Sequence, residues 1–181
     1  MNKDRELALV RDCQRGDREA METLVRSFDR PVYRATFRML GNRDDAADVT
    51  QTVFLKVFEN IHRFDASFRL FSWVYRIAVN EAIDQLDRRR RDGPMPETEQ
   101  AADDESQDRA AAAQVSREVQ GALMELQEDY RAVIVLRYFT ECSYREIGEI
   151  LQLPEKTVKS RLFTARQQMK CRLEQRGCLA P

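Results

Sequence analysis

Apolar residues recur every three to four positions along most of the chain, which is the period of an α-helix rather than of a strand. Only 6 Gly and 5 Pro interrupt the 181 residues, and strict alternation of apolar and polar residues is absent. A hydrophobic content of 43% is enough to bury a core, so the chain is expected to fold. These features together predict an all-α protein.

Four helices are expected in the first half of the chain. Gly16 ends the first, Gly41 ends the second, and Pro31 is a candidate kink inside the second. Acidic residues near the start of the third helix suit the positive end of the helix dipole. The expected helices cover 3–14, about 20–40, a segment that starts between 42 and 45, and about 70–91, with a loop over 64–69.

Residues 92–114 interrupt the apolar period. They hold two prolines and many acids but almost no large apolar side chains, a composition typical of a linker. Over 92–118 the chain has 2 basic residues against 8 acidic ones. The prediction is two small helical domains: an N-terminal helical bundle over 1–91, a flexible acidic linker over 92–115 whose alanine-rich end can be helical, and a C-terminal helix-turn-helix domain over 116–181.

The segment 143–173 has the pattern of a helix-turn-helix. Ser143 and Glu146 form a capping box that starts a short helix. Residues 152–153 make a tight turn, and Pro154 suits the first turn of the next helix because its missing N–H costs little there.

The second helix of this motif divides into two faces when it is projected at 100° per residue. The apolar face carries Val158, Leu162, Ala165, Met169 and Leu173. The opposite face carries Lys156, Lys159, Ser160, Phe163, Gln167 and Lys170, with Arg161 and Arg166 at its sides. Residues 154–176 hold 7 basic residues against 2 acidic ones, and a helix of this kind fits the major groove of DNA. The alternative is an ordinary helical hairpin with a solvated charged face.

The helix over 70–91 carries a tryptophan on its polar side. Trp73 and Asn80 are seven residues apart and share that side with Arg76. An unpaired base can stack on Trp73 while the other two side chains hydrogen-bond to base edges or phosphate. The four arginines that follow add positive charge for the DNA backbone. An equally good interpretation is a tryptophan packed under a loop, with arginines that complement the helix C-terminus.

The third expected helix interleaves acidic and apolar residues without a basic bias. Such a surface suits a protein partner better than DNA. A solvated helix face is the usual alternative for a run of this kind.

Three segments, in this order, resemble the extracytoplasmic-function (ECF) sigma factors, the minimal two-domain members of the main bacterial sigma family. They are RDDAADVTQTVFLKVF, FSWVYRIAVNEAIDQLDRRRR and LRYFTECSYREIGEILQLPEKTVKSRLFTAR, with the acidic linker between the second and the third. The likeness extends from about residue 7 to residue 173. It implies a protein that directs RNA polymerase to specific promoters and starts transcription without being an enzyme itself.

The resemblance implies three surfaces. The polymerase face would bind the coiled coil of the largest RNA polymerase subunit, and it comprises Asp44, Asp45, Asp48, Gln51, Thr52, Leu55 and Lys56. The melting face, together with the loop over 64–69, would recognise and open the −10 promoter element, and it comprises Trp73, Arg76, Asn80, Asp84 and Arg88. The reading face would bind the −35 element, and it comprises Lys156, Thr157, Lys159, Ser160, Arg161, Phe163 and Arg166.

The resemblance also implies an inhibitor, because members of this family are commonly held inactive by an anti-sigma factor. Two residues depart from the family pattern. Asp87 stands where many relatives carry a basic residue, which weakens the positive charge at that point. Lys156 stands where glycine is usual, which adds positive charge near the −35 element.

Other functions have less support from the residues. One histidine, His62, and four scattered cysteines without a C-x-x-C pair predict no metal, no cofactor and unpaired thiols. The chain also lacks a nucleophile–base set and a glycine-rich phosphate loop, which argues against an enzyme.

Two alternatives from other classes stay open. A helix-turn-helix repressor or activator that acts without RNA polymerase would bind a palindromic duplex tightly. A helical adaptor that binds only protein is disfavoured by the basic reading face. The N-terminus has no apolar signal core, so a cytoplasmic protein without membrane contact is expected.

Overall fold

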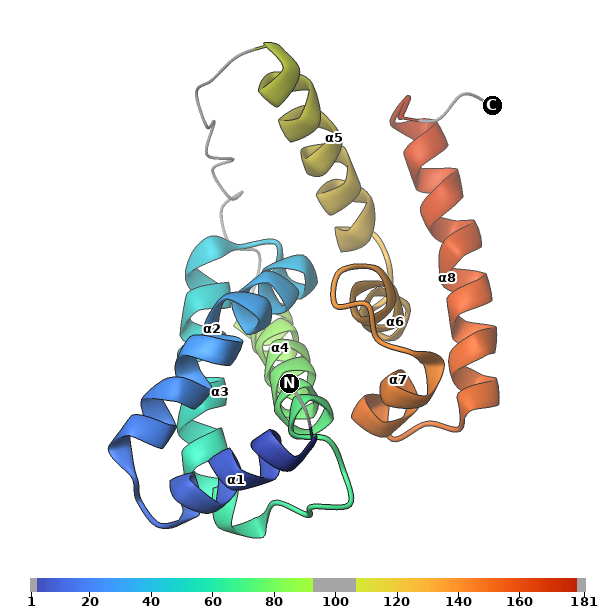
Figure 1. The fold of residues 1–181 in the computed structure, drawn as a ribbon. Helices are drawn as coiled ribbons and strands as arrows, with labels where there is room; N and C mark the ends of the chain where they lie inside the picture. Colours follow the sequence, from blue (N-terminus) through green and yellow to red (C-terminus); the bar gives the residue numbers. More distant parts are fainter. Residues whose placement is uncertain (1–2, 93–106, 179–181) are drawn as a thin grey trace.

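The computed structural model describes residues 3–92 and 107–178, and within these ranges the chain is helical and has no strand. The prediction of an all-α protein is confirmed. The helices are α1 (Lys3–Gln14), α2 (Arg18–Leu40), α3 (Arg43–Asn60), the short 3₁₀ helix η1 (Ile61–Arg63), α4 (Leu70–Asp92), α5 (Gln107–Met124), α6 (Glu128–Tyr138), α7 (Tyr144–Leu151) and α8 (Glu155–Gln175) (Figure 1).

Local side-chain chemistry sets the ends of the N-terminal helices. The Asp17 carboxylate caps α2 by accepting a hydrogen bond of 2.8 Å from the backbone N–H of Glu19. Gly41 ends α2 in the left-handed conformation, with φ at 70°. The next residue, Asn42, caps α3 with its side chain. Pro31 lies inside α2, and the helix continues past it.

The N-terminal half is a bundle in which α2, α3 and α4 pack against one another and α1 lies across α2 and η1 (Figure 1). Its core is formed by aliphatic side chains that face inward from the three long helices, including Leu24, Val32, Val53 and Val74. Each of these positions belongs to the apolar period of its helix, so the sequence pattern places them correctly.

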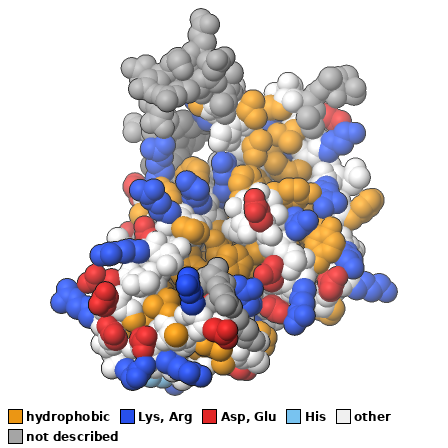
Figure 2. Space-filling model, viewed as in Figure 1, with side chains coloured by type: hydrophobic (Ala, Val, Ile, Leu, Met, Phe, Trp, Pro, Cys, Tyr) orange, Lys and Arg blue, Asp and Glu red, His pale blue; other side chains and the backbone are white. Residues whose placement is uncertain are grey.

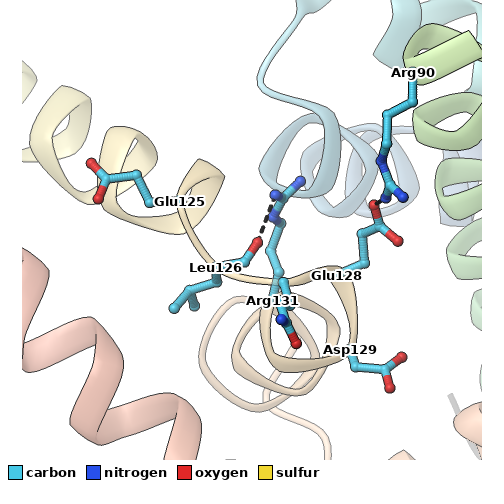
Figure 3. A pocket seen from close by; sticks show the side chains of 7 residues that line it. Arg90, Glu125, Leu126, Glu128, Asp129 and Arg131 are labelled. Carbon is cyan, nitrogen blue, oxygen red and sulfur yellow. Dashed lines mark hydrogen bonds and ion pairs between the residues drawn. The ribbon is translucent and has the colours of Figure 1, made fainter.

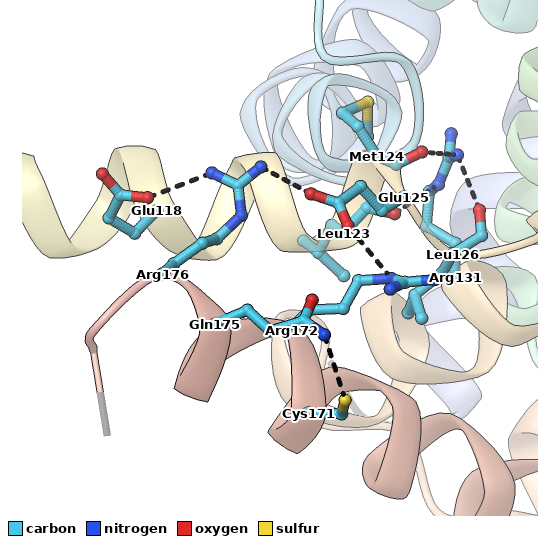
Figure 4. Close-up of polar contacts among 10 residues, drawn as sticks. All are labelled: Glu118, Leu123, Met124, Glu125, Leu126, Arg131, Cys171, Arg172, Gln175 and Arg176. Carbon is cyan, nitrogen blue, oxygen red and sulfur yellow. Dashed lines mark hydrogen bonds and ion pairs between the residues drawn. The ribbon is translucent and has the colours of Figure 1, made fainter. Parts of the chain in front are cut away.

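The C-terminal half is built around α6. Six consecutive residues of α6, from Arg131 to Leu136, are buried, so this helix has no solvated face along that stretch. The helices α7 and α8 pack on α6, and α5 runs along α8. Arg176 near the end of α8 holds α5 through ion pairs of 3.0 Å to Glu118 and 2.6 Å to Glu125 (Figure 4).

The two halves pack against each other and share one continuous apolar core. α7 contacts α4, and both α5 and α6 contact α2. Tyr75 of α4 is buried beside this junction, and burial raises the pKa of the neighbouring Cys142 thiol to about 11. The sequence left the relative placement of the domains open, and the tertiary structure supplies it.

Arg131 is the only buried basic residue among the described residues, and its partners are backbone carbonyls. Its guanidinium donates to the carbonyls of Leu123 and Leu126, each at 2.9 Å (Figure 4). It also donates to the carbonyl of Met39 at 2.5 Å. Burial and the charge of Arg90 lower the pKa of Arg131 to about 10. These bonds tie the α5–α6 turn to the end of α2, because Met39 lies in the last turn of that helix.

Most of the predicted linker lies outside the described residues. Its alanine-rich end is helical, because α5 begins at Gln107. None of the helices in the described ranges combines the length and the apolarity needed to cross a bilayer. The four cysteines are free thiols: Cys13 and Cys142 are buried, Cys171 is exposed and Cys178 is partly exposed.

Gly41 is expected to be less replaceable than Gly16, although both have positive φ. A Cβ atom at Gly41 would lie 2.5 Å from Met124 Sδ of α5, whereas one at Gly16 would meet nothing within 4 Å. We expect Gly16→Ala to lower the free energy of unfolding by about 1 kcal/mol through backbone strain. Gly41→Ala should cost roughly 1 kcal/mol more, because Met124 must move. Urea unfolding measures the free energy of unfolding of both variants. Equal losses in the two variants would contradict a tight contact between α2 and α5.

Candidate nucleic-acid interface

The helix-turn-helix is held in shape by its cap and its turn. Ser143 Oγ accepts from the backbone N–H of Glu146 at 3.2 Å, and the Glu146 carboxylate accepts from the Ser143 N–H at 2.8 Å. The predicted capping box is therefore present. After α7, Gln152 adopts a left-handed conformation, and the Leu153 N–H donates to the Gly148 carbonyl at 2.9 Å. A Cβ at Gly148 would lie 2.7 Å from the Leu153 carbonyl oxygen, so this tight turn requires glycine.

The two faces of α8 separate as the sequence predicts. Val158, Leu162 and Ala165 are buried against the rest of the C-terminal domain. The reading face lies on the outside, where Phe163 exposes 66% of its surface. Of the remaining reading-face residues, Lys156, Lys159, Ser160 and Arg166 are exposed and Thr157 and Arg161 are partly exposed. Figure 2 shows Lys and Arg side chains along the edge of the molecule over α8.

Three cations of the reading face already have partners on the protein. Lys159 pairs with Glu155 at 2.9 Å, and its ammonium lies 5.7 Å from the ring centre of Tyr144. Arg161 pairs with Asp129 of α6 at 2.9 Å. Arg166 lies over the ring of Tyr138 at 5.6 Å. These contacts hold the side chains along the α8 surface without burying them, so they remain available to phosphates.

Tyr138 and Tyr144 were missed by the sequence interpretation. They border the reading face, and Tyr138 exposes 53% of its surface. The interleaving of aromatic and basic residues over 137–145 is the pattern that indicates them.

The melting face on α4 is only partly exposed to solvent. Asn80, Asp84 and Arg88 are exposed, whereas Trp73 is half-buried with its ring edge against Phe64 at 5.4 Å between ring centres. Trp73 therefore packs against the loop that precedes α4, as one of the two interpretations held. The Arg76 guanidinium stacks over Phe68 at 5.4 Å and donates to the backbone carbonyl of Glu149 in α7 at 3.0 Å.

The polymerase face on α3 is exposed at its centre. Asp44, Asp48 and Gln51 point to solvent, Thr52 is partly exposed, and Leu55 exposes 63% of its surface. An exposed leucine among acidic and amide side chains gives this face no basic bias, so it does not favour contact with DNA phosphates.

Two residues of the polymerase face turn towards α4 instead. Asp45 is buried, where it pairs with Arg89 and accepts a hydrogen bond of 3.0 Å from Gln85. Lys56 pairs with the buried carboxylate of Glu81. Both residues join α3 to α4 in this structure, and the projection of a single helix could not reveal these partners.

No group of three or more His, Cys, Asp or Glu side chains gathers as a metal site would require among residues 3–92 and 107–178. The three faces instead expose hydrogen-bonding groups, charges or aromatic rings to solvent.

Comparison with sequence families finds two matches. The family described as Sigma-70 region 2 matches residues 24–92, and Sigma-70 region 4 matches residues 116–169. The first match contains the polymerase and melting faces, and the second contains the reading face.

Curated relatives are similar over nearly the whole chain. The ECF RNA polymerase sigma factor SigW of Bacillus subtilis is 32% identical, with 91% of this chain and 94% of the relative covered. The RNA polymerase sigma-H factor of Pseudomonas aeruginosa is 30% identical, with 92% and 93% covered.

Solved structures show the same fold. The structure of CnrH in complex with the cytosolic domain of CnrY matches with a TM-score of 0.74 at 24% identity, and it covers 93% of this chain and 97% of that one. The sigma factor RpoE in complex with the anti-sigma factor NepR from Bartonella quintana matches with a TM-score of 0.69 at 23% identity, with 84% and 96% covered.

The capping box leads to a pH-dependent prediction. Burial opposes ionisation of Glu146, but hydrogen bonds from the Ser143 hydroxyl and N–H outweigh it and hold the pKa of Glu146 below 4.5. A depressed pKa stabilises the fold above pH 4.5, and this contribution is lost as the pH falls through the lowered value. Ser143→Ala should therefore cost about 1 kcal/mol at neutral pH and less in acid.

Thermal unfolding of the two proteins across the acidic range measures this difference. Ser143→Thr is the matched control, because a threonine hydroxyl can cap the same helix. A cost for Ser143→Ala that stays constant down to low pH would contradict the role of the Glu146 carboxylate.

Proposed function

The chain belongs to the ECF sigma factors, and from that premise we propose that its three exposed faces act together on RNA polymerase and promoter DNA. The reading face binds the −35 element, the melting face holds the −10 element, and the polymerase face docks the core enzyme. One observation supports this proposal most: Phe163 is 66% exposed on a helix whose opposite side is buried in the core. A phenylalanine that stands among Lys and Arg side chains offers apolar contact beside positive charge, which fits a thymine methyl group next to DNA phosphates.

The −35 element is read in the major groove by the N-terminal half of α8. Lys156 and Lys159 neutralise phosphates or reach guanine edges, and Ser160 can serve either partner. The Phe163 ring supplies apolar contact for a thymine methyl group. Arg161 and Arg166 flank this strip and position the helix on the backbone.

The −10 element is held as a single strand on α4. A base that leaves the duplex stacks on an aromatic ring, which offsets the cost of unpairing. Trp73 is the ring at this position, and Asn80 lies two turns away, where it can hydrogen-bond to a base edge. Arg88 then contacts the phosphate backbone.

The core enzyme docks on α3. Asp48, Gln51 and Leu55 form the exposed centre of the polymerase face, with Asp44 beside them at the start of the helix. Asp45 and Lys56 support this surface from beneath through their ion pairs with α4. Docking brings two weak DNA-binding faces to one promoter, so their contacts gain from a raised effective concentration.

An anti-sigma factor is the proposed inhibitor, and the cytoplasm, where core polymerase works, is the proposed location. Support comes from the family itself and from its solved members, of which RpoE is described as bound to the anti-sigma factor NepR. The protein is proposed to be a regulator of transcription and not an enzyme.

Transcription in vitro with core polymerase and a promoter library tests this function. Run-off product that appears only when this protein is added supports it. Tight binding to a duplex without core polymerase, with no such product, would favour a repressor or activator instead.

Variants of the reading face and of the polymerase face should fail at different steps. Lys159→Ala and Phe163→Ala remove a phosphate contact and an apolar base contact, so each should lower −35-dependent initiation by roughly fivefold to a hundredfold while core binding is unchanged. Asp48→Arg reverses a charge on the polymerase face and should weaken core binding by about tenfold or more.

Matched controls exist on the same helices. Lys170→Ala removes a cation beyond the reading face on α8, and Glu59→Arg reverses a charge at the far end of α3. Both controls should stay near wild type. The assignment of roles is wrong if Lys159→Ala and Asp48→Arg show the same defect.

A further inference from the structure

The loop over 64–69 joins η1 to α4 and leads into the melting face. Inside it, the Asp65 carboxylate accepts a hydrogen bond of 2.8 Å from the Ser67 N–H, and the Phe68 N–H donates to the Asp65 carbonyl at 3.1 Å. These bonds shape a turn within the loop. They do not fix the loop relative to α4, so its placement depends on contacts from other elements.

Helix α1 contacts this segment at both of its ends. At one end, the Gln14 side-chain amide donates to the Ile61 carbonyl at 2.9 Å. At the other end, the Arg69 guanidinium donates hydrogen bonds of 2.8 and 3.2 Å to the two carboxylate oxygens of Glu6. An α-helix rises about 1.5 Å per residue, so Glu6 and Gln14 lie about 12 Å apart along the axis of α1. This helix therefore fixes the separation between the two ends of the loop.

The Glu6 carboxylate also completes the start of α4. The Leu70 N–H donates to it at 3.4 Å. The first turn of α4 contains no acidic residue of its own, so Glu6 supplies the negative charge that suits the positive end of the helix dipole. Only 4% of Glu6 is exposed, and a carboxylate removed from water needs partners of this kind. Glu6 and the residues that begin α4 therefore specify each other's position.

Two kinds of contact connect this anchor to the melting face. The Arg69 carbonyl accepts a hydrogen bond of 3.1 Å from the Trp73 N–H. The loop also supplies two aromatic rings: Phe64 packs against the Trp73 ring. The second ring, that of Phe68, lies under the Arg76 guanidinium. A displacement of the loop would thus change the surroundings of both melting-face side chains.

We propose that Glu6 and Gln14 of α1 are positioning residues for recognition of the −10 element, and that they set the shape of the loop over 64–69. This inference rests on the proposed function. A buried carboxylate offers no contact to DNA phosphates, so Glu6 acts through Arg69 and the loop rather than on the promoter itself. With both anchors intact, the loop and Trp73 present one fixed surface to the unpaired bases, and fixed geometry is what recognition of a particular base requires.

The opposite end of α4 is fixed by separate contacts. Arg89 pairs there with Asp45 of α3, and these two residues lie far along the chain from the loop. Arg90 pairs with Glu128 at the start of α6 (Figure 3). A change at Glu6 leaves these ion pairs in place, so the polymerase face on α3 and the reading face on α8 should be unaffected.

Glu6→Gln tests the anchor, because it keeps the size of the side chain and removes the charge that pairs with Arg69. The assay is run-off transcription with core polymerase on a promoter that wild type selects from the library, and on derivatives with single base changes in the −10 element. The preference of Glu6→Gln for the original −10 element should be roughly threefold to tenfold weaker than that of wild type. Its preference among −35 derivatives and its binding to core polymerase should match wild type.

The matched control is Glu19→Gln, the same substitution at an exposed position in the first turn of α2, which should keep the wild-type preference. The ratio of product between promoters separates positioning from stability. A loss of folded protein lowers the product from every promoter by the same factor, so a purely structural role would leave this ratio unchanged.

Gln14→Ala supplies an independent test at the other anchor. It removes the hydrogen bond to the Ile61 carbonyl at a partly exposed position, and it should weaken the −10 preference in the same way. Arg11→Ala, a change at an exposed residue of the same helix, is its control. If Glu6→Gln yields no folded protein, the ratio measured with Gln14→Ala decides the question.

A double variant shows whether Glu6 acts through Arg69. Glu6→Gln combined with Arg69→Gln should weaken the −10 preference no more than Arg69→Gln alone, whereas additive losses would contradict the proposal. An unchanged −10 preference in both Glu6→Gln and Gln14→Ala would overturn it, and so would an equal loss of −35 preference. Absence of product with every protein, wild type included, would instead reject the proposed function.

Discussion

Burial of six consecutive residues of helix α6 is the constraint on which the rest of the structure depends. Its residues from Arg131 to Leu136 support α7 and α8 on one side and lie against α2 on the other. Buried apolar area contributes about 25 cal/mol per Å² to stability, so one helix helps to build the helix-turn-helix and also to hold the two domains together. The packed arrangement thus arises from the same apolar surface that the C-terminal domain needs to fold.

The two faces that are proposed to bind DNA differ in exposure because their helices have different neighbours. The outer side of α8 faces solvent, and three of its cations contact nearby carboxylates or a tyrosine ring. The corresponding side of α4 has α7 next to it, and Arg76 is bound there. The proposed single-strand surface on α4 is therefore partly covered by α7, whereas the proposed duplex-reading surface on α8 is exposed.

Predictions from the sequence succeeded where a residue's surroundings depend on its own helix. The capping box, the exposed Phe163 and the apolar stripe of α8 all follow from spacing within one element. Helix projection alone could not decide whether Trp73 is free to stack on a base or packs under a loop. Its environment depends on Phe64 in the preceding loop. It also treated Asp45 and Lys56 as surface groups, although their ion-pair partners lie on the neighbouring helix.

The sequence by itself determined the helices, their ends, the tight turn, the separation of polar from apolar faces and the family. These properties depend on interactions between residues a few positions apart, which leave a period or a motif in the chain. Only the tertiary structure decided that Arg131 binds the Met39 carbonyl, 92 positions away, and that Arg76 binds the Glu149 carbonyl, 73 positions away. Both acceptors are backbone carbonyls, which every residue has, so no residue type marks them in the sequence, and these pairs exist only because the two domains share a core.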